Sequence, residues 1–75
     1  MPWTPLKGIA RAIIKQKERA VRVSEFKRAL MNEIGVTGKD TLRKYIRIAE
    51  EMGWIEFDGT DILKLCPERI EERWR

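Results

Sequence analysis

One amphipathic stretch, residues 37–55 (TGKDTLRKYIRIAEEMGWI), constrains the fold of this 75-residue chain more than any other. Its apolar residues recur three or four positions apart, which is the spacing of one face of an α-helix. These residues are Leu42, Tyr45, Ile46, Ala49 and Met52. We expect a helix over about 38–52 that Thr37 caps and Gly53 ends, because glycine adopts the left-handed conformation of a helix C-terminus without strain. The strand-like segment 54–57 follows at once.

The opposite face of this helix is polar and mainly basic. Asp40, Lys44, Arg47 and Glu51 lie on it, with Arg43 on its flank. The spacing would allow Asp40 to pair with Lys44 and Arg47 with Glu51, and such pairs stabilise exposed helices by about 0.2–0.5 kcal/mol each. Two interpretations therefore stay open: a solvated surface that neutralises its own charges, or a surface that contacts an anionic partner.

Two further helices are predicted before this one. Thr4 caps the first and Pro5 occupies its first position, while Ser24 caps the second and Gly35 closes it. The apolar stripe of the first helix is Leu6, Ile9, Ala10, Ile13 and Ile14. The inner face of the second is Phe26, Ala29, Leu30 and Ile34. Gly8 weakens the first helix by about 1 kcal/mol relative to Ala, and a close contact between helices would explain it.

The remaining segments predict a small sheet and a last helix. The strand candidates are residues 20–23, 54–57 and 62–65, and Asp58-Gly59 between the last two suits a type I′ hairpin turn. Pro67 marks the start of a final short helix, with Ile70 and Trp74 on its apolar edge.

Charge is distributed unevenly along the chain, whose net charge is +4. Residues 1–49 carry 12 Lys/Arg against 4 Asp/Glu, a net of +8, and residues 50–75 carry 4 against 8, a net of −4. A composition with 37% charged residues and few amides is typical of heat-adapted proteins, but heat adaptation does not segregate the two signs. The segregation favours a polyanion that approaches one side of the molecule.

Several functional classes are excluded on composition. One cysteine and no histidine leave no disulfide framework, no plausible zinc site and no activated nucleophile, so we expect neither an enzyme nor a metal or cofactor. No apolar run approaches the roughly 18 residues of a membrane span, and no signal pattern begins the chain. We expect a cytoplasmic protein that forms a single domain over residues 1–75.

The predicted order is helix, short strand, helix, helix, strand, strand, helix. This order, and above all the segment 41–55 (TLRKYIRIAEEMGWI), resembles the winged helix-turn-helix DNA-binding domains of bacterial and archaeal regulators. The shared features are a basic amphipathic helix, its Glu-Glu-apolar-Gly ending and an apolar pair that opens the wing. The resemblance implies an α+β, mainly helical fold: a three-helix core, a small antiparallel β-wing and a short C-terminal helix.

In that family the third helix enters the major groove of DNA, with its N-terminal half and outer face toward the bases and phosphates. Carried onto this chain, the resemblance implies DNA contacts by Lys39, Asp40, Thr41, Arg43, Lys44 and Arg47. It also implies contacts to the DNA backbone by Arg22, Lys27 and Arg28. The hairpin departs from the family pattern because its tip is acidic (EFDGTD, residues 56–61), so we expect a wing that completes the fold or faces a protein partner.

We therefore expect sequence-selective binding of double-stranded DNA by a small transcription regulator. A homodimer is expected through the terminal helices, with Ile9, Ile13, Ile70 and Trp74 at its surface. The alternative is a protein-docking module of a replication, transcription or RNA-processing assembly that binds a basic partner through the acidic wing or tail. A single-strand or RNA role is weaker, because the sequence shows no basic groove lined with exposed aromatic residues.

Overall fold

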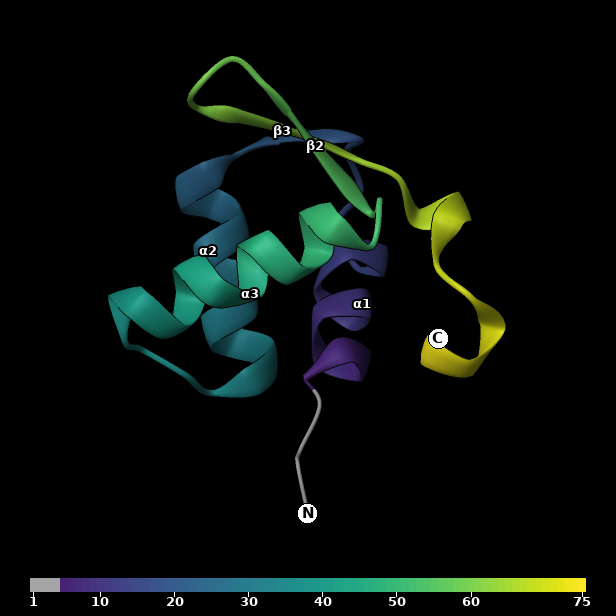
Figure 1. Cartoon of the computed structure of the whole chain (residues 1–75), viewed down its shortest axis with the longest axis horizontal. Coiled ribbons are helices and arrows are strands. Elements are labelled where there is room, and N and C mark those ends of the chain that lie inside the picture. The colour runs from purple at the N-terminus through teal and green to yellow at the C-terminus, as the bar shows by residue number, and fades with distance from the viewer. Residues whose placement is uncertain (1–4) are drawn as a thin grey trace.

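Three helices and a three-stranded sheet make up the computed structural model of the chain, which describes residues 5–75 (Figure 1). The elements are α1 (Leu6–Ile14), β1 (Ala20–Arg22), α2 (Val23–Ile34), α3 (Lys39–Glu51), β2 (Ile55–Asp58), β3 (Ile62–Leu65) and two 3₁₀ turns (Pro67–Arg69 and Glu72–Trp74). In Figure 1, α3 crosses in front of α2 and α1, and the β2–β3 hairpin rises above them. The predicted α+β class is confirmed. Within residues 5–75, no helix is long and apolar enough to cross a membrane.

The sheet is antiparallel, with β3 between β1 and β2. The prediction of a third strand is confirmed over residues 20–22, while Val23 already begins α2, and this strand gives β3 a partner on its second edge. The first hairpin strand begins one residue later than predicted, because Trp54 still belongs to the turn after α3. The predicted type I′ turn is wrong: Asp58 pairs with Ile62, so Gly59, Thr60 and Asp61 form a longer loop in which only Gly59 has a positive φ.

The core lies where the three helices meet the inner face of the sheet. Its largest fully buried side chains are those of Trp54, Phe26, Ile9, Ile13, Leu30, Ile55 and Leu63. The predicted helical stripes are confirmed apart from their last members, because Ile14 is 41% exposed and Met52 is 38% exposed. Ile14 is the last residue of α1 and Met52 is the C-cap of α3, and Ala12 is buried in α1 although the stripe omitted it.

Two predicted helix caps lie one or two residues from the actual helix starts. Gly38, not Thr37, is the N-cap of α3, and no side chain hydrogen-bonds to its first turn. Helix α2 begins at Val23 with Arg22 as its N-cap, so Ser24 is already helical. The Arg22 N–H donates to Glu25 Oε1 at 3.2 Å, and this carboxylate replaces the expected serine cap. Thr4, the predicted cap of α1, lies outside the described residues.

Helix α3 ends as predicted at Gly53, whose φ of +80° lies in the left-handed region. The Gly53 N–H donates to the Glu50 carbonyl and the Trp54 N–H donates to the Ala49 carbonyl, both at 3.0 Å. These two bonds form a Schellman motif, which satisfies carbonyls that the helix end leaves unpaired. Trp54 and Ala49 are both buried, so the turn between α3 and β2 packs against the core.

The C-terminal segment forms two 3₁₀ turns instead of the predicted single helix. Ile70 adopts an extended backbone (φ −79°, ψ 122°), which interrupts the helix and places its side chain in the core at 3% exposure. The segment lies beside α1, and Trp74 packs half-buried against the core (Figure 1). Ile9, Ile13 and Ile70 are therefore buried within one chain and are not available for the predicted dimer surface, of which only Trp74 is partly exposed. That the chain forms a homodimer stays a prediction.

Gly8 is explained by a close approach of two helices. A Cβ atom built at Gly8 would lie 2.7 Å from Cγ1 and 3.1 Å from Cδ1 of Ile34, which ends α2. Carbon atoms do not tolerate a 2.7 Å contact, so the Ile34 side chain or the helix that carries it would have to shift. The predicted helix–helix contact is confirmed.

We expect Gly8→Ala to lower the free energy of unfolding by about 1 kcal/mol, because an overpacking cost of about 1–3 kcal/mol exceeds the helix-propensity gain of about 1 kcal/mol. In an Ile34→Ala background the clash is removed, and the same substitution should then stabilise the protein by about 1 kcal/mol. Urea denaturation of the four proteins of this cycle measures both values. Equal effects of Gly8→Ala in the two backgrounds would contradict the proposed contact.

Gly53→Ala should lower the free energy of unfolding by about 1 kcal/mol, because an alanine in the left-handed conformation is strained. The space around Gly53 is not limiting, since the nearest atom to a Cβ there is Arg69 Nη1 at 3.8 Å. Gly53→Asn is the matched control, because asparagine tolerates this conformation and should lose less than half as much. Equal losses in the two variants, measured by urea denaturation, would show that backbone conformation is not the cause.

Candidate nucleic-acid interface

The outer face of α3 forms an open hollow lined by Asp40, Arg43, Lys44 and Arg47. These four residues stand at positions i, i+3, i+4 and i+7 of one helix, so they share a single face. All four are exposed, while the opposite face of the helix buries Leu42, Ile46 and Ala49 in the core. The apolar stripe of α3 therefore sets the direction in which its cations point.

Among residues 5–75, the cations of this face are paired with no acidic side chain. The ion pairs within residues 5–75 join Lys15 to Glu33 (2.8 Å), Arg73 to Glu71 (3.0 Å), Arg19 to Glu68 (3.2 Å) and Arg69 to Glu56 (3.3 Å). The pairs that the helical spacing would allow, between Asp40 and Lys44 and between Arg47 and Glu51, do not form. The self-neutralising interpretation of the face is thus not supported, and its positive charge remains available to a ligand.

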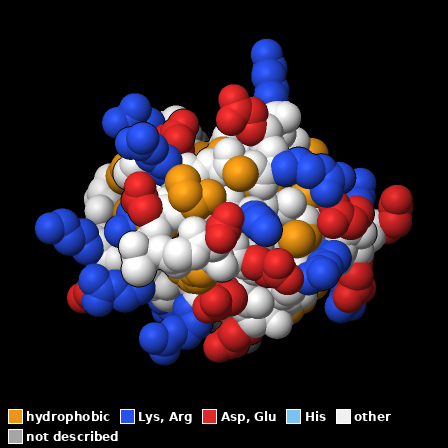
Figure 2. All heavy atoms as spheres, turned by 90° about the horizontal axis from the view of Figure 1, so that it is seen from above, with side chains coloured by type: hydrophobic (Ala, Val, Ile, Leu, Met, Phe, Trp, Pro, Cys, Tyr) orange, Lys and Arg blue, Asp and Glu red, His pale blue; other side chains and the backbone are white. Residues whose placement is uncertain are grey.

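The balance of charge differs between the two sides of the face that Figure 2 shows. In Figure 2, Lys and Arg side chains gather at the left, which is the side on which α3 begins in Figure 1. Acidic side chains are concentrated from the middle to the right, where they alternate with cations. On the face that Figure 2 shows, the excess of cations thus lies on the side on which α3 begins, and an anion nearby would be attracted to that side.

The structure does not bring all the predicted contact residues into one hollow. Lys39 is exposed in the first turn of α3, next to the hollow in sequence. Thr41 is half-buried, with its Oγ1 3.5 Å from the position of a Cβ at Gly38, so it faces the start of the helix and not the hollow. Arg22 ends β1, and Lys27 and Arg28 follow on α2, so these three cations come from the elements before α3.

The β2–β3 hairpin contributes acidic side chains and little positive charge. Asp58 and Asp61 are exposed at its tip, and Lys64 lies across the ladder from Glu56. Glu56 is held by Arg69, whose Nη1 lies 3.3 Å from Glu56 Oε1 and also donates to the Gly53 carbonyl at 3.3 Å. Arg69 thereby ties the first 3₁₀ turn to the end of α3, which is a structural role.

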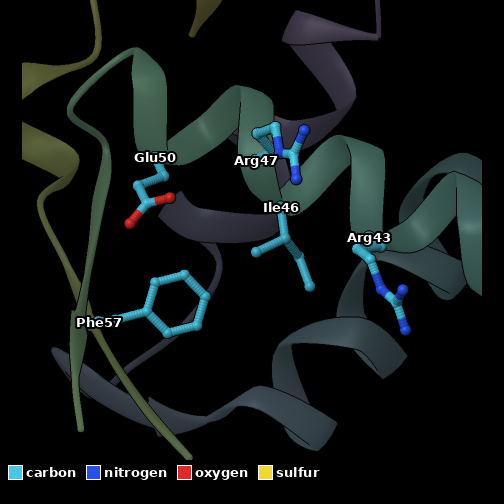
Figure 3. A pocket seen from close by; sticks show the side chains of 5 residues that line it. All are labelled: Arg43, Ile46, Arg47, Glu50 and Phe57. Atoms are coloured by element: carbon cyan, nitrogen blue, oxygen red, sulfur yellow. The ribbon is translucent and has the colours of Figure 1, made fainter. Parts of the chain in front are cut away.

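A second hollow lies between α3 and the hairpin (Figure 3). Arg43, Ile46, Arg47 and Glu50 line it from α3, and Phe57 lines it from β2 with its ring turned toward the helix. Sequence reasoning missed Phe57 and Glu50 as candidate site residues. Strand alternation places Phe57 on the core side with Ile55, but its 43% exposure depends on how far the hairpin extends beyond the core.

No protein-family model, curated protein or solved structure matches the chain. Its function is therefore inferred from its own geometry and charge. In the described range 5–75, no three His, Cys, Asp or Glu side chains come together in a way that would hold a metal ion.

Because the cations of α3 make no ion pair with any described residue, replacing them should hardly change stability. We expect Lys44→Gln and Arg47→Gln each to change the free energy of unfolding by less than about 0.5 kcal/mol. Ile46→Ala, between them in sequence but 6% exposed, should lose about 2 kcal/mol or more. A loss above about 1 kcal/mol in either glutamine variant, measured by urea denaturation, would show that the residue supports the fold.

Proposed function

We propose that the chain is a winged helix-turn-helix domain that binds double-stranded DNA, with α3 in the major groove, and that it acts as a small transcription regulator. The observation that supports this function best is the row of exposed cations on α3, Lys39, Arg43, Lys44 and Arg47, none of which has an acidic partner within residues 5–75. The unneutralised cations of such a row repel one another in the folded chain, and a polyanionic ligand would relieve this repulsion.

The dimensions and chemistry of α3 suit a major groove. Its 13 residues span about 20 Å, and a B-DNA major groove admits one α-helix. The guanidinium groups of Arg43 and Arg47 match the O6 and N7 acceptors of guanine, and lysine can reach guanine or phosphate. Backbone N–H groups at the start of α3, where no side chain caps the helix, are available to a phosphate oxygen.

The elements before α3 supply contacts that position the protein on DNA without reading sequence. The turn 35–38 joins α2 to α3, which is the connection length of a helix-turn-helix. Arg22, Lys27 and Arg28 would then meet phosphates beside the groove and set the register of α3. The acidic tip of the hairpin, Asp58 and Asp61, would be repelled by phosphates, so binding relies on the helices.

A second candidate is a protein-docking module. It is favoured by the exposed carboxylates of Asp58 and Asp61, which make no ion pair in the described part of the chain and would attract a basic partner. In that function the cations of α3 would have no ligand, so DNA binding at physiological salt would be almost absent. This difference separates the two candidates in one measurement.

The deciding experiment is fluorescence-anisotropy binding of a random duplex pool at several salt concentrations, followed by sequencing of the bound fraction. Neutralising about six phosphates should give a slope of log affinity against log salt of about −5. An enriched motif would support sequence-selective binding, while salt-sensitive binding without enrichment would indicate a protein that reads only the DNA backbone. Absence of binding at low salt would exclude DNA as the ligand.

We expect the double variant Lys44→Gln/Arg47→Gln to bind the selected duplex at least tenfold more weakly. It should lower the magnitude of the salt slope by about 1, because Lys44→Gln removes a phosphate contact while Arg47→Gln removes a contact to a base. Lys64→Gln is the matched control, since Lys64 is an exposed cation on the hairpin and should leave both values nearly unchanged. An equal effect per removed charge would mean that only net charge matters and that α3 is not the contact surface.

A further inference from the structure

The hollow between α3 and the hairpin adds an apolar surface to the basic face of α3. It shares Arg43 and Arg47 with the hollow of the outer face, so the two are continuous. Phe57 pairs with the fully buried Leu63, which fixes its ring on the inner side of the sheet, toward α3 (Figure 3). An aromatic ring 43% exposed beside two unpaired arginines is an apolar contact surface placed next to a phosphate-binding one.

Glu50 gives this hollow a hydrogen-bond acceptor. It is exposed, its side chain makes neither an ion pair nor a hydrogen bond with another described residue, and it lines the hollow one helical turn from Ile46. Figure 3 shows its carboxylate on the same side of α3 as the Phe57 ring. An ionised carboxylate only accepts hydrogen bonds, so the hollow combines arginine donors, one acceptor and an apolar wall.

These three chemistries match the major-groove edge of one base pair. Guanine offers the O6 and N7 acceptors that arginine binds, and cytosine offers an N4 amino donor that a carboxylate accepts. A methyl group on C5 of that cytosine would match the apolar wall of the hollow. Thymine also carries this methyl group, but its O4 acceptor would be opposed to the Glu50 carboxylate.

We propose that the hollow lined by Phe57, Ile46 and Glu50 receives a 5-methylcytosine of double-stranded DNA, with Arg43 or Arg47 on the paired or adjacent guanine. The methyl group contacts Phe57 and the part of the largely buried Ile46 that lines the hollow, and the N4 amino group donates to Glu50. This inference rests on the proposed function, because it needs α3 in the major groove. It assigns Glu50 of α3 and Phe57 of the hairpin a part in selecting the base.

The test uses the full chain and the duplex enriched from the random pool, in which each cytosine is replaced in turn by 5-methylcytosine and each thymine by uracil. We expect 5-methylcytosine at one position to tighten binding about fourfold, the gain from burying one methyl group. Phe57→Ala should remove this preference. The preference is the ratio of the affinities of one variant for the methylated and the unmethylated duplex, so it does not depend on any general loss of affinity in that variant. Ile14→Ala, which removes a similarly exposed side chain of α1, should keep it.

Glu50→Gln tests the acceptor, because an amide also offers donors to a thymine O4 and should reduce the preference for cytosine over thymine at that position. Salt-sensitive duplex binding that no 5-methylcytosine changes would overturn the inference and leave the proposed function in place. A loss of affinity when thymine is replaced by uracil, without a gain of affinity from 5-methylcytosine, would also overturn the inference and would make thymine the occupant of the hollow. Absence of duplex binding would overturn both.

Discussion

The turn that ends α3 is the constraint on which the rest of the structure depends. Two hydrogen bonds from Gly53 and Trp54 close the helix, and the left-handed Gly53 directs the chain from α3 into β2. Trp54 is buried there, and its carbonyl accepts from the Cys66 N–H at 2.7 Å. Arg69 binds the Gly53 carbonyl from the C-terminal segment. This one turn thus connects α3, both hairpin strands and the last turns of the chain, and it determines where Phe57 stands relative to α3.

The basic face of α3 follows from the separation of its two surfaces. Leu42, Ile46 and Ala49 hold the helix against the core, so its cations point away from the molecule. Acids that are close to these cations in sequence do not neutralise them, while most of the ion pairs that do form join separate elements of the chain. The side of the molecule that carries α3 therefore keeps a positive field, and the hairpin, whose own cation is Lys64, adds to it an aromatic ring instead of charge.

Much of the fold was predictable because it is encoded locally. Apolar spacing located the three helices, and glycine marked the ends of α2 and α3, since the left-handed conformation at Gly35 and Gly53 strains other residues. The errors fell where local signals are weak. Several residues can cap a helix, so Thr37 and Ser24 were as plausible as the residues that actually do so. The C-terminal segment was predicted as a helix, but burial of Ile70 in the core required an extended backbone at that point.

By itself, the sequence determined the composition of the candidate site: an amphipathic helix whose polar face carries Arg43, Lys44 and Arg47, followed at once by a strand. Only the tertiary structure decided which of these charges remain unpaired and which side chains stand beside them. Ion pairing depends on distances of a few ångström between residues far apart in the chain, and helical spacing does not specify them. The exposure of Phe57 next to Ile46 and Glu50 likewise arises only when β2 folds back along α3, because strand alternation defines a face but not what covers it.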